Sequence, residues 1–340
     1  MVSKREYDES DVRSRPARSS RPRTKDRPDY TNAEQALVIA VDRGRTTVLI
    51  NEDPTKLVTA MKARELGKKS VVVGDTVGVV GDLTGSEGSL ARIVTVAPRK
   101  NALTRTVDDA ADLERMIVSN VDQMGIVLAA ANPEPRHGFI DRALVVAFDQ
   151  GIKPILIITK CDLADPTEFL ANYVELDLEI YRTQKGADLA DIRLALSNKR
   201  TVLLGHSGVG KSTLVNALVD TADRATGIVN EVTGRGRHTS SSALALKLNP
   251  VPGENETGWI IDTPGVRSFG VAHVDSNRVI AAFGEFTEAI EHCPKNCSHN
   301  EENCALNSWE LDAKSKSRLE NLRGLFREAI RSSNRATNSK

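Results

Sequence analysis

Short apolar runs rich in β-branched residues dominate residues 33–97, and turn residues separate them. Runs of this length bounded by Gly, Pro and Asp are typical of β-strands. Five of them in about 65 residues predict a small antiparallel barrel, and an OB-like barrel fits best. The expected strands are Leu37–Val41, Thr46–Ile50, Lys69–Val73, Thr76–Val80 and Leu90–Val96.

From about residue 112 to 275, apolar runs alternate with helical stretches, notably Asp141–Gln150 and Lys211–Val219. This alternation is typical of an α/β domain with a mostly parallel sheet and flanking helices. Residues 276–340 are predicted to be helical around a cysteine cluster. The strands expected in the α/β region are Met124–Ala130, Pro154–Thr159, Leu178–Thr183, Thr201–Gly205, Ala243–Leu248 and Trp259–Asp262.

The pattern therefore predicts a multidomain α/β protein with an arm (1–32), a barrel (33–100), an α/β domain (101–275) and a helical domain with a basic tail (276–340). The arm is rich in Arg, Ser, Pro and Asp and has no apolar periodicity, so we expect it to be disordered. Its alternative interpretation is a solvated tail that has no partner.

Composition narrows the class of protein. With 40% hydrophobic and 27% charged residues, the chain fits a globular protein and excludes a fibrous or fully disordered one. Its apolar stretches are far shorter than the roughly 20 residues that a membrane span requires. The N-terminus has no apolar signal region, so we expect a cytoplasmic protein without a membrane partner.

The formal net charge of zero conceals an uneven distribution. Residues 1–32 carry a net charge of +3 and residues 311–340 a net charge of +5, which leaves −8 for residues 33–310. Two basic ends can bind phosphates although the whole chain is neutral, so the total does not exclude an RNA partner. In the barrel no aromatic residue is available for base stacking, and its basic side chains form either a phosphate-binding face or a solvated face.

Residues 205–212 match the phosphate-loop pattern GxxxxGK[ST], between a predicted strand and a predicted helix that begins near Thr213. Glycines in such a loop let backbone N–H groups surround a phosphate at a helix N-terminus. Lys211 is expected to neutralise the β- and γ-phosphates, and the Ser212 hydroxyl to bind Mg²⁺. The predicted nucleotide-binding residues here are Gly205, His206, Ser207, Gly208, Val209, Gly210, Lys211, Ser212 and Thr213.

Two further strand ends carry candidate nucleotide ligands. Asp262 follows an apolar strand and is expected to hold Mg²⁺ through water, while the N–H of Gly265 is placed to reach the γ-phosphate. Residues 159–162 (Thr159, Lys160, Cys161 and Asp162) are similar to the [NT]KxD element of GTPases. A carboxylate at Asp162 can accept hydrogen bonds from the ring N–H and exocyclic amine of guanine, which adenine does not offer.

The order of these motifs is unusual. In ordinary GTPases the phosphate loop comes first and the base-reading NKxD comes last, whereas here residues 159–162 precede the phosphate loop and Asp262 follows it. A circular permutation of the chain builds the same sheet from this order. The predicted fold is therefore a circularly permuted P-loop domain.

Three of the four cysteines lie within twelve residues, in the pattern Cys293-x₃-Cys297-x-His299-x₄-Cys304. Three thiolates and one imidazole satisfy tetrahedral Zn²⁺, and in a cytosolic chain such a cluster indicates a metal rather than a disulfide. His292 competes with His299 as the imidazole ligand, and reduced buried cysteines are the structural alternative. Cys161 is expected to serve packing.

Taken together, these motifs resemble the RsgA/YjeQ family of GTPases that depend on the small ribosomal subunit. The likeness covers about residues 33–310 and rests on 73–75 (VGD), 91–93 (ARI), 159–162 (TKCD), 205–213 (GHSGVGKST), 234–239 (GRGRHT), 262–265 (DTPG) and the Cys/His cluster. The resemblance implies an OB barrel, a permuted GTPase domain and a C-terminal zinc domain with His299 as its third ligand. It also implies GTP hydrolysis that the small (30S) subunit stimulates, at a late checkpoint of subunit maturation.

Catalysis needs a group that orients the attacking water. Position 266 is Val266, close to where many GTPases place a glutamine, and an apolar side chain cannot polarise water. His238 is the candidate, supported by the resemblance, and Thr239 is expected to reach Mg²⁺. In this hypothesis the loop is loose until docking on ribosomal RNA orders it, and the catalytic set is His238, Lys211 and Thr239. The alternative is that His238 is an ordinary surface residue.

Three functional classes follow from the sequence. The first is a ribosome-triggered GTPase with one structural Zn²⁺, Mg²⁺ bound with GTP or GDP, and the small subunit with its 16S rRNA as partner. The second is an ATPase or small-molecule kinase, which Asp162 disfavours. The third is a zinc-bearing RNA-binding module with a vestigial nucleotide site, which Lys211, Ser212 and Asp262 disfavour. Nothing in the sequence demands a dimer, so a monomer is expected.

Overall fold

The computed structural model describes residues 30–42, 44–67, 69–106, 114–219, 243–250, 253, 257–263 and 274–338, with side chains as far as residue 327. The chain divides into two compact units, residues 1–32 and 33–340. The helices and strands given below belong to the second unit. Apart from residues 30–32, the predicted arm lies outside the described residues.

A five-stranded barrel follows residue 32, as the sequence predicts, although one of its strand pairings is parallel rather than antiparallel. Strand β1 pairs with both β2 and β4, β3 pairs with β2 and β5, and β4 with β5, so the strands close on themselves. Valines and isoleucines at alternate positions fill the interior, among them Val38, Val48 and Ile93. The strands are β1 (Glu34–Asp42), β2 (Arg45–Ile50), β3 (Leu57–Lys62), β4 (Thr76–Gly81) and β5 (Ala91–Val96).

The third strand differs from the prediction. The expected strand Lys69–Val73 is wrong, since within it only Val73 makes an isolated bridge, to Val118. Strand β3 lies instead at Leu57–Lys62, where Val58 and Ala60 are buried in the barrel interior and Thr59 between them is partly exposed. Lysine and threonine dilute the apolar signal of this segment, and its pairing with β2 and β5 makes it a strand.

A buried carboxylate joins the barrel to the domain that follows. Asp75 is fully buried and accepts hydrogen bonds from Arg99 Nε at 2.6 Å, Ser119 Oγ at 2.6 Å and the backbone N–H of Val72 at 2.9 Å. At Gly74, with φ of 91°, a Cβ would lie 2.0 Å from the carbonyl oxygen of Ser119, so only glycine fits. This network fixes residues 72–75 against β7 (Glu114–Ser119), which pairs with β6 (Ala102–Thr106).

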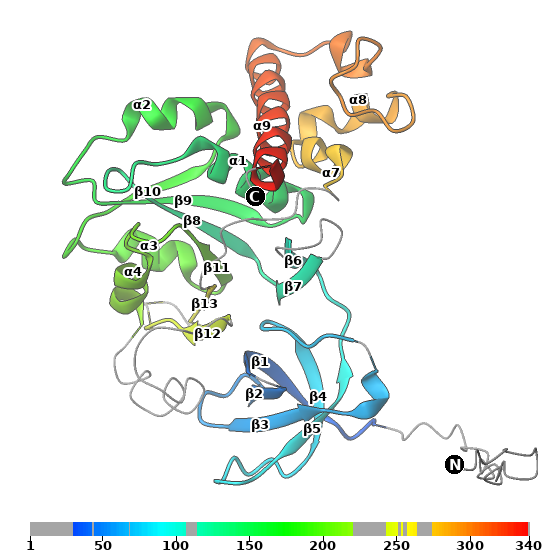
Figure 1. Cartoon of the computed structure of the whole chain (residues 1–340), viewed down its shortest axis with the longest axis vertical. Coiled ribbons are helices and arrows are strands. Elements are labelled where there is room, and N and C mark those ends of the chain that lie inside the picture. Colours follow the sequence, from blue (N-terminus) through cyan, green and yellow to red (C-terminus); the bar gives the residue numbers. More distant parts are fainter. Residues whose placement is uncertain are drawn as a thin grey trace, which may run out of the picture. The chain divides into compact units, whose positions relative to one another are not determined.

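The α/β domain contains five parallel strands in the order β10-β9-β8-β11-β13, with β12 antiparallel at the side of β13. The mostly parallel sheet is therefore confirmed, and Figure 1 shows its strands beside the barrel. Strand β1 pairs with β12 at one position, Ala40 with Leu244. The strands are β8 (Gln123–Ala129), β9 (Lys153–Thr159), β10 (Glu179–Arg182), β11 (Arg200–Leu204), β12 (Leu244–Lys247) and β13 (Trp259–Asp262).

Helices cover both faces of this sheet. Apolar side chains of α3 (Ala190–Leu196) and α4 (Lys211–Leu218) pack on Val127, Ile157 and Leu203. The other face, with Ile126, Leu156 and Val202, is covered by α1 (His137–Asp149). Beside it lie α2 (Thr167–Leu170) and the 3₁₀ helix η3 (Ala171–Leu176). Helix α1 begins at His137, four residues before the predicted start at Asp141. The residue before the helix, Arg136, makes no capping hydrogen bond with its side chain.

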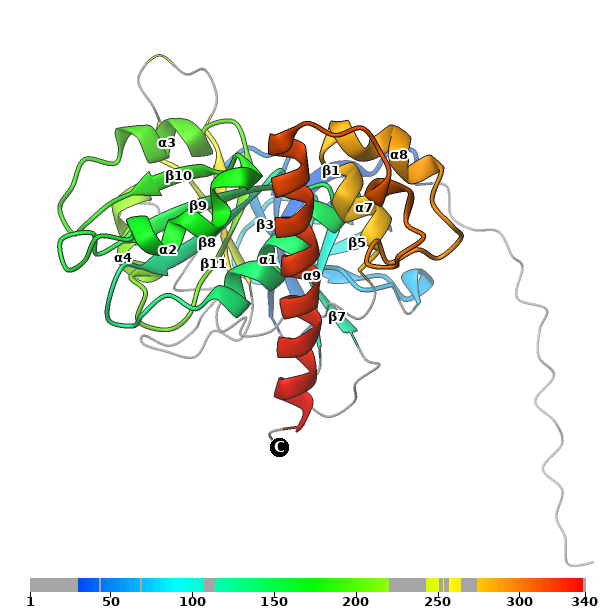
Figure 2. The same ribbon diagram turned by 90° about the horizontal axis from the view of Figure 1, so that it is seen from above.

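The C-terminal region is helical, as predicted. Helix α9 (Ala313–Asn338) lies along α1, between the sheet helices and the α7–α8 region (Figures 1 and 2). Its anchor is Arg318, which is 8% exposed and pairs with Asp177 and Glu285. Among the described residues, no helix combines the length and apolarity that crossing a bilayer requires. The other helices here are α7 (Ser276–Ala281), η4 (Gly284–Phe286), α8 (Thr287–Glu291) and η5 (Ala305–Asn307).

Candidate functional site

The phosphate-binding loop lies between β11 and α4, as its motif predicts. Gly208 and Gly210 have φ of 83° and 88°, in the left-handed region that favours glycine. A Cβ at Gly205 would lie 2.7 Å from the carbonyl oxygen of Val127 on β8. The backbone therefore turns tightly from strand to helix, which brings Lys211 and Ser212 to the first turn of α4.

Lys211 and Asp262 form an ion pair at the end of the sheet. Asp262 ends β13, which is paired in register with β11, and it lies opposite Leu203. The hydroxyl of the buried Thr263 donates to the carbonyl oxygen of Leu203 at 3.0 Å, which holds this strand end in place. The structure thus brings together two predicted nucleotide ligands that are 51 residues apart in sequence.

The TKCD element begins at Thr159, the last residue of β9, beside the phosphate loop. The Thr159 hydroxyl lies 3.1 Å from the carbonyl oxygen of Leu128 and 2.5 Å from that of Val209 in the phosphate loop. Thr159 is buried, and its side chain faces backbone atoms of the loop, whereas Asp162 is exposed. All four residues are candidate nucleotide-binding residues by their motif, with Asp162 as the expected reader of the base. The structure indicates that Thr159 positions the loop and leaves Asp162 at the surface.

Two further loops, which carry no nucleotide-binding motif, also lie at this edge. Lys160 Nζ donates to the carbonyl oxygen of Asn132, and the N–H of Cys161 donates to that of Thr183 at 3.2 Å. Both loops follow parallel strands, β8 and β10. The carboxyl ends of parallel strands form the ligand-binding edge of such sheets. The predicted strands therefore already indicated that the loops after β8 and β10 lie at the candidate site.

Several predicted residues lie outside the described residues. These include the catalytic candidates His238 and Thr239 with the rest of 234–239, and also Gly265 and Val266. Of the phosphate loop, His206 packs its ring against Phe139 of α1 at a centroid distance of 4.4 Å. The loop is therefore supported from α1 as well as from β9.

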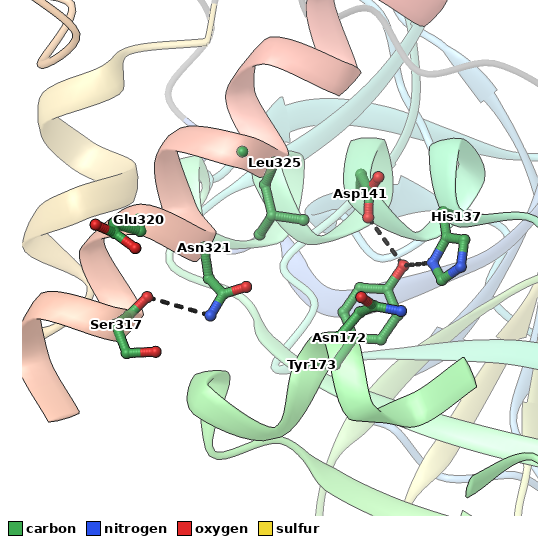
Figure 3. Close-up of a pocket in the computed structure, with 9 residues that line it drawn as sticks. His137, Asp141, Asn172, Tyr173, Ser317, Glu320, Asn321 and Leu325 are labelled. Carbon is green, nitrogen blue, oxygen red and sulfur yellow. Dashed lines mark hydrogen bonds between the residues drawn. The ribbon is translucent and has the colours of Figure 1, made fainter. Parts of the chain in front are cut away.

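A separate cavity of about 390 Å³ lies between α1, η3 and α9 (Figure 3). At its side, His137 Nδ1 lies 2.9 Å from the hydroxyl of Tyr173, which donates to Asp141 Oδ1 at 2.9 Å. Burial and the neighbouring Asp141 raise the pKa of Tyr173, so this hydroxyl stays protonated. None of the predicted nucleotide residues lines this cavity, and the candidate nucleotide site is the sheet edge instead.

The Cys/His cluster is assembled as predicted. One ligand atom from each of Cys293, Cys297, His299 and Cys304 can be chosen so that all four lie within 4.8 Å of one another. His292, the competing imidazole, instead stacks on Trp309 at a centroid distance of 5.3 Å.

The geometry of the cluster fits a tetrahedral ion. Bonds of about 2.3 Å to sulfur and 2.0–2.1 Å to nitrogen place two sulfurs about 3.8 Å apart, and a sulfur and a nitrogen about 3.6 Å apart. The Sγ atoms of Cys293 and Cys304 are 3.8 Å apart, and His299 Nδ1 lies 3.6 Å and 3.7 Å from them. The backbone N–H of His299 donates to Cys297 Sγ at 3.4 Å. Three ligand atoms thus have tetrahedral spacing, and Cys297 Sγ lies within 4.8 Å of each of them, so the four residues can hold a metal ion.

Sequence comparison relates this chain to a known family. Residues 96–272 match the sequence model of the RsgA GTPase family. "Small ribosomal subunit biogenesis GTPase RsgA" of Pseudomonas aeruginosa (strain LESB58) is 38% identical over 234 residues, which are 65% of this chain and 66% of that protein. "Small ribosomal subunit biogenesis GTPase RsgA 1" of Vibrio vulnificus (strain YJ016) is 34% identical over 259 residues, 74% of this chain and 71% of the relative. The match thus spans just under two thirds of the Pseudomonas protein.

Solved structures resemble the whole fold. YjeQ from Thermotoga maritima has a TM-score of 0.57 and 26% identity, and the match covers 87% of this chain and 98% of that one. YloQ, described as a circularly permuted GTPase, has a TM-score of 0.58 and 21% identity, with 92% and 98% covered. The predicted barrel and the permuted order of motifs are thereby confirmed. The family model covers more than half of the chain, which therefore belongs to the RsgA GTPase family of circularly permuted P-loop GTPases.

Proposed function

We propose that this protein hydrolyses GTP to GDP and phosphate, and that the small ribosomal subunit stimulates it during late subunit maturation. The observation that carries the proposal is the convergence of Lys211, Asp262 and residues 159–162 at one edge of the sheet. The names of the curated relatives, which refer to small-subunit biogenesis, support the choice of partner.

The nucleotide roles follow from position. Lys211 is paired with Asp262 and has little exposure, so it is poised to exchange this partner for the β- and γ-phosphates. Asp162 is exposed at the end of β9, where its carboxylate can accept the two N–H groups of guanine. Lys160 Nζ bonds to Asn132, which holds its aliphatic stem in the same region.

Magnesium is expected to bind together with the nucleotide. Ser212 offers a hydroxyl in the first turn of α4 and Asp262 a carboxylate beside Lys211, a hard oxygen donor set that suits Mg²⁺. Thr239 is the proposed third protein ligand. When bound, the ion neutralises charge on the β- and γ-phosphate oxygens. His238 orients the attacking water, a role that Val266 cannot take.

Zinc is the ion proposed for the Cys/His cluster. The donor set of three sulfurs and one nitrogen, and the tetrahedral spacing of its atoms, support one structural Zn²⁺ per chain. In the metal-free chain, burial raises the pKa of the Cys297 thiol to about 12. A bound cation would oppose this rise, because it stabilises the thiolate form of the sulfur.

The barrel offers a surface for ribosomal RNA, here proposed to be 16S rRNA. Arg45 on β2, Met61 on β3 and Arg92 on β5 are exposed and lie in register on adjacent strands. Two arginines flank one methionine, without an aromatic ring, which suits contact with phosphates rather than stacking on bases. Lys62 is less available, because its ammonium group donates to the carbonyl oxygens of Gly67 and Lys69.

The chain is proposed to consist of three domains after its N-terminal arm. The proposed domain boundaries are 33–100 for the barrel, 101–275 for the GTPase domain and 276–340 for the zinc-binding domain with its basic tail. The protein is proposed to act as a monomer in the cytoplasm, where the small subunit matures.

GTP turnover with and without purified small subunits, in a series of salt concentrations, tests the proposed function. We expect a low basal rate, a large increase with subunits, and a loss of this increase as salt screens the phosphate contacts. Turnover that subunits leave unchanged would contradict the proposal. Competition by unlabelled GTP and ATP against a fluorescent guanine nucleotide separates this function from an ATPase, because only GTP should compete.

A further inference from the structure

His299 is held between the sulfur ligands and a helix outside the cluster. Its side chain is fully buried, with Nδ1 directed at the sulfurs of Cys293 and Cys304. The other ring nitrogen, Nε2, lies 2.9 Å from Oδ1 of Asn277 on α7. Both ring nitrogens therefore have partners, and they belong to different parts of the chain.

The two contacts together define the tautomer of the ring. A nitrogen that binds a metal must offer a lone pair, so binding through Nδ1 requires the ring proton on Nε2. The oxygen of Asn277 is a suitable acceptor for this proton. Ligand histidines commonly donate their second N–H to such an acceptor, which fixes the orientation of the ring and raises its basicity.

Asn277 is itself held from two sides. Its backbone N–H donates to Asp275 Oδ1 at 2.9 Å, and the N–H of Asp275 donates to Asp149 Oδ1 of α1 at the same distance. The adjacent Ser276 donates from Oγ to the carbonyl oxygen of Cys297 at 3.2 Å. The start of α7 is thus bonded both to the metal-ligand loop and to α1.

Helix α7 is the next described element after β13 in the sequence. The helix begins at Ser276, fourteen residues after Asp262, the candidate nucleotide ligand at the end of β13. We propose that Asn277 is a positioning residue, which sets Nδ1 of His299 as the metal ligand and attaches the metal centre to the start of α7. The inference rests on the zinc site proposed above and does not depend on GTP hydrolysis.

Two substitutions at one position test it. Asn277→Leu keeps the branched shape at Cγ and removes the acceptor, whereas Asn277→Asp keeps an oxygen that can only accept. We expect Asn277→Leu to weaken zinc binding by about 10- to 100-fold, in a competition titration of the full-length chain with a chromogenic zinc chelator. Asn277→Asp is expected to retain the affinity of the unsubstituted chain or exceed it.

Asn300→Ala is the matched control. Asn300 lies in the ligand loop next to His299, but its amide bonds to Ser298 and Arg327 instead of to a ligand, so its removal should leave the zinc affinity unchanged. Equal affinity in Asn277→Leu and the unsubstituted chain overturns the inference. So does an Asn277→Asp variant as weak as Asn277→Leu.

A second measurement needs no variant. Long-range ¹H–¹⁵N correlation spectra of the zinc-loaded chain with labelled histidine distinguish the metal-bound nitrogen from the protonated one. We expect His299 to be bound through Nδ1 and protonated at Nε2, and the opposite pattern overturns the inference even if Asn277→Leu does not fold. Metal analysis of the unsubstituted chain is independent of both: a chain without zinc refutes the zinc proposal itself.

Discussion

The hydroxyl of Thr159 lies 2.5 Å from the carbonyl oxygen of Val209, so the end of β9 is tied to the phosphate-binding loop. Gly210 lies on the same side, where an added Cβ would be 3.3 Å from the Thr159 oxygen. Thr159, the first residue of the TKCD element, thus positions the phosphate loop by a hydrogen bond from its side chain to the loop backbone.

Thr159→Val is expected to weaken GDP binding about tenfold. The substitution keeps the shape of the side chain and removes one buried hydrogen bond, worth about 1–1.5 kcal/mol, which corresponds to about a factor of ten in affinity. Titration with a fluorescent GDP analogue measures it. Thr159→Ser, which keeps the hydroxyl, is the control. Normal GDP affinity in Thr159→Val would show that the loop is held without this bond.

His238→Ala is expected to lower the subunit-stimulated turnover of GTP by about 100-fold, in the range for loss of one catalytic side chain. GTP affinity should be retained, because in the proposed mechanism this histidine acts on water and not on the nucleotide. Turnover with saturating small subunits, together with nucleotide titration, separates the two effects. His292→Ala, a substitution of a histidine that stacks on Trp309, is the control. Full stimulation in His238→Ala rejects the assignment.

Arg318→Met is expected to lower the free energy of unfolding by about 2 kcal/mol, since charged hydrogen bonds of a buried side chain are lost. Arg318 pairs with Asp177 and Glu285 and donates to the carbonyl oxygen of Glu175 at 2.6 Å. Lys314→Met provides the comparison, because Lys314 is on the same helix and pairs with the same Asp177, yet both groups are 59% exposed. Its loss should cost less than about 1 kcal/mol. Equal effects in urea unfolding would contradict this ranking.

His137 is expected to make the fold sensitive to mild acid. Burial lowers the pKa of His137 below its usual value of 6.5, so the folded chain resists a protonation that the unfolded chain accepts. Its contribution to stability is complete above pH 6.5 and is lost as the pH falls through the lower, folded-state pKa. Protonation also places a second proton on a ring that already faces Tyr173.

Urea unfolding of the unsubstituted chain and of His137→Gln between pH 7.5 and 5 measures this contribution as the difference between two pH profiles. The difference removes the effect of His299, whose pKa is also lowered by burial. We expect the profile of His137→Gln to be flatter in this range. An NMR titration that places the pKa of His137 at or above 6.5 contradicts the expectation.

Local chemistry explains which features were predictable. The phosphate loop, residues 159–162 and the Cys/His cluster were found because each is a short run whose residue types and spacing already specify the chemistry. The strands of the parallel sheet were found because both of their faces are buried, which makes each a continuous apolar run. These signals do not depend on the rest of the chain.

Other features depend on contacts between distant segments. Strand β3 (Leu57–Lys62) exists because β2 and β5 pair with it, and two of its own six residues are polar. The short pair β6–β7 has no comparable apolar signal. The roles of Thr159 and Asn277 depend on partners 50 and 22 residues away, so no local pattern could reveal them.

The pairing of β1 with β12 bears on how the protein can be dissected. Strand β12 has β13 on one side and the barrel strand β1 on the other. A truncation that removes residues 33–100 would leave β12 as an open edge, with Leu37 and Ile39 no longer covering the core that they share with the GTPase domain. Such a fragment is an aggregation hazard, and poor solubility in deletion studies would report on this edge rather than on a lost RNA contact.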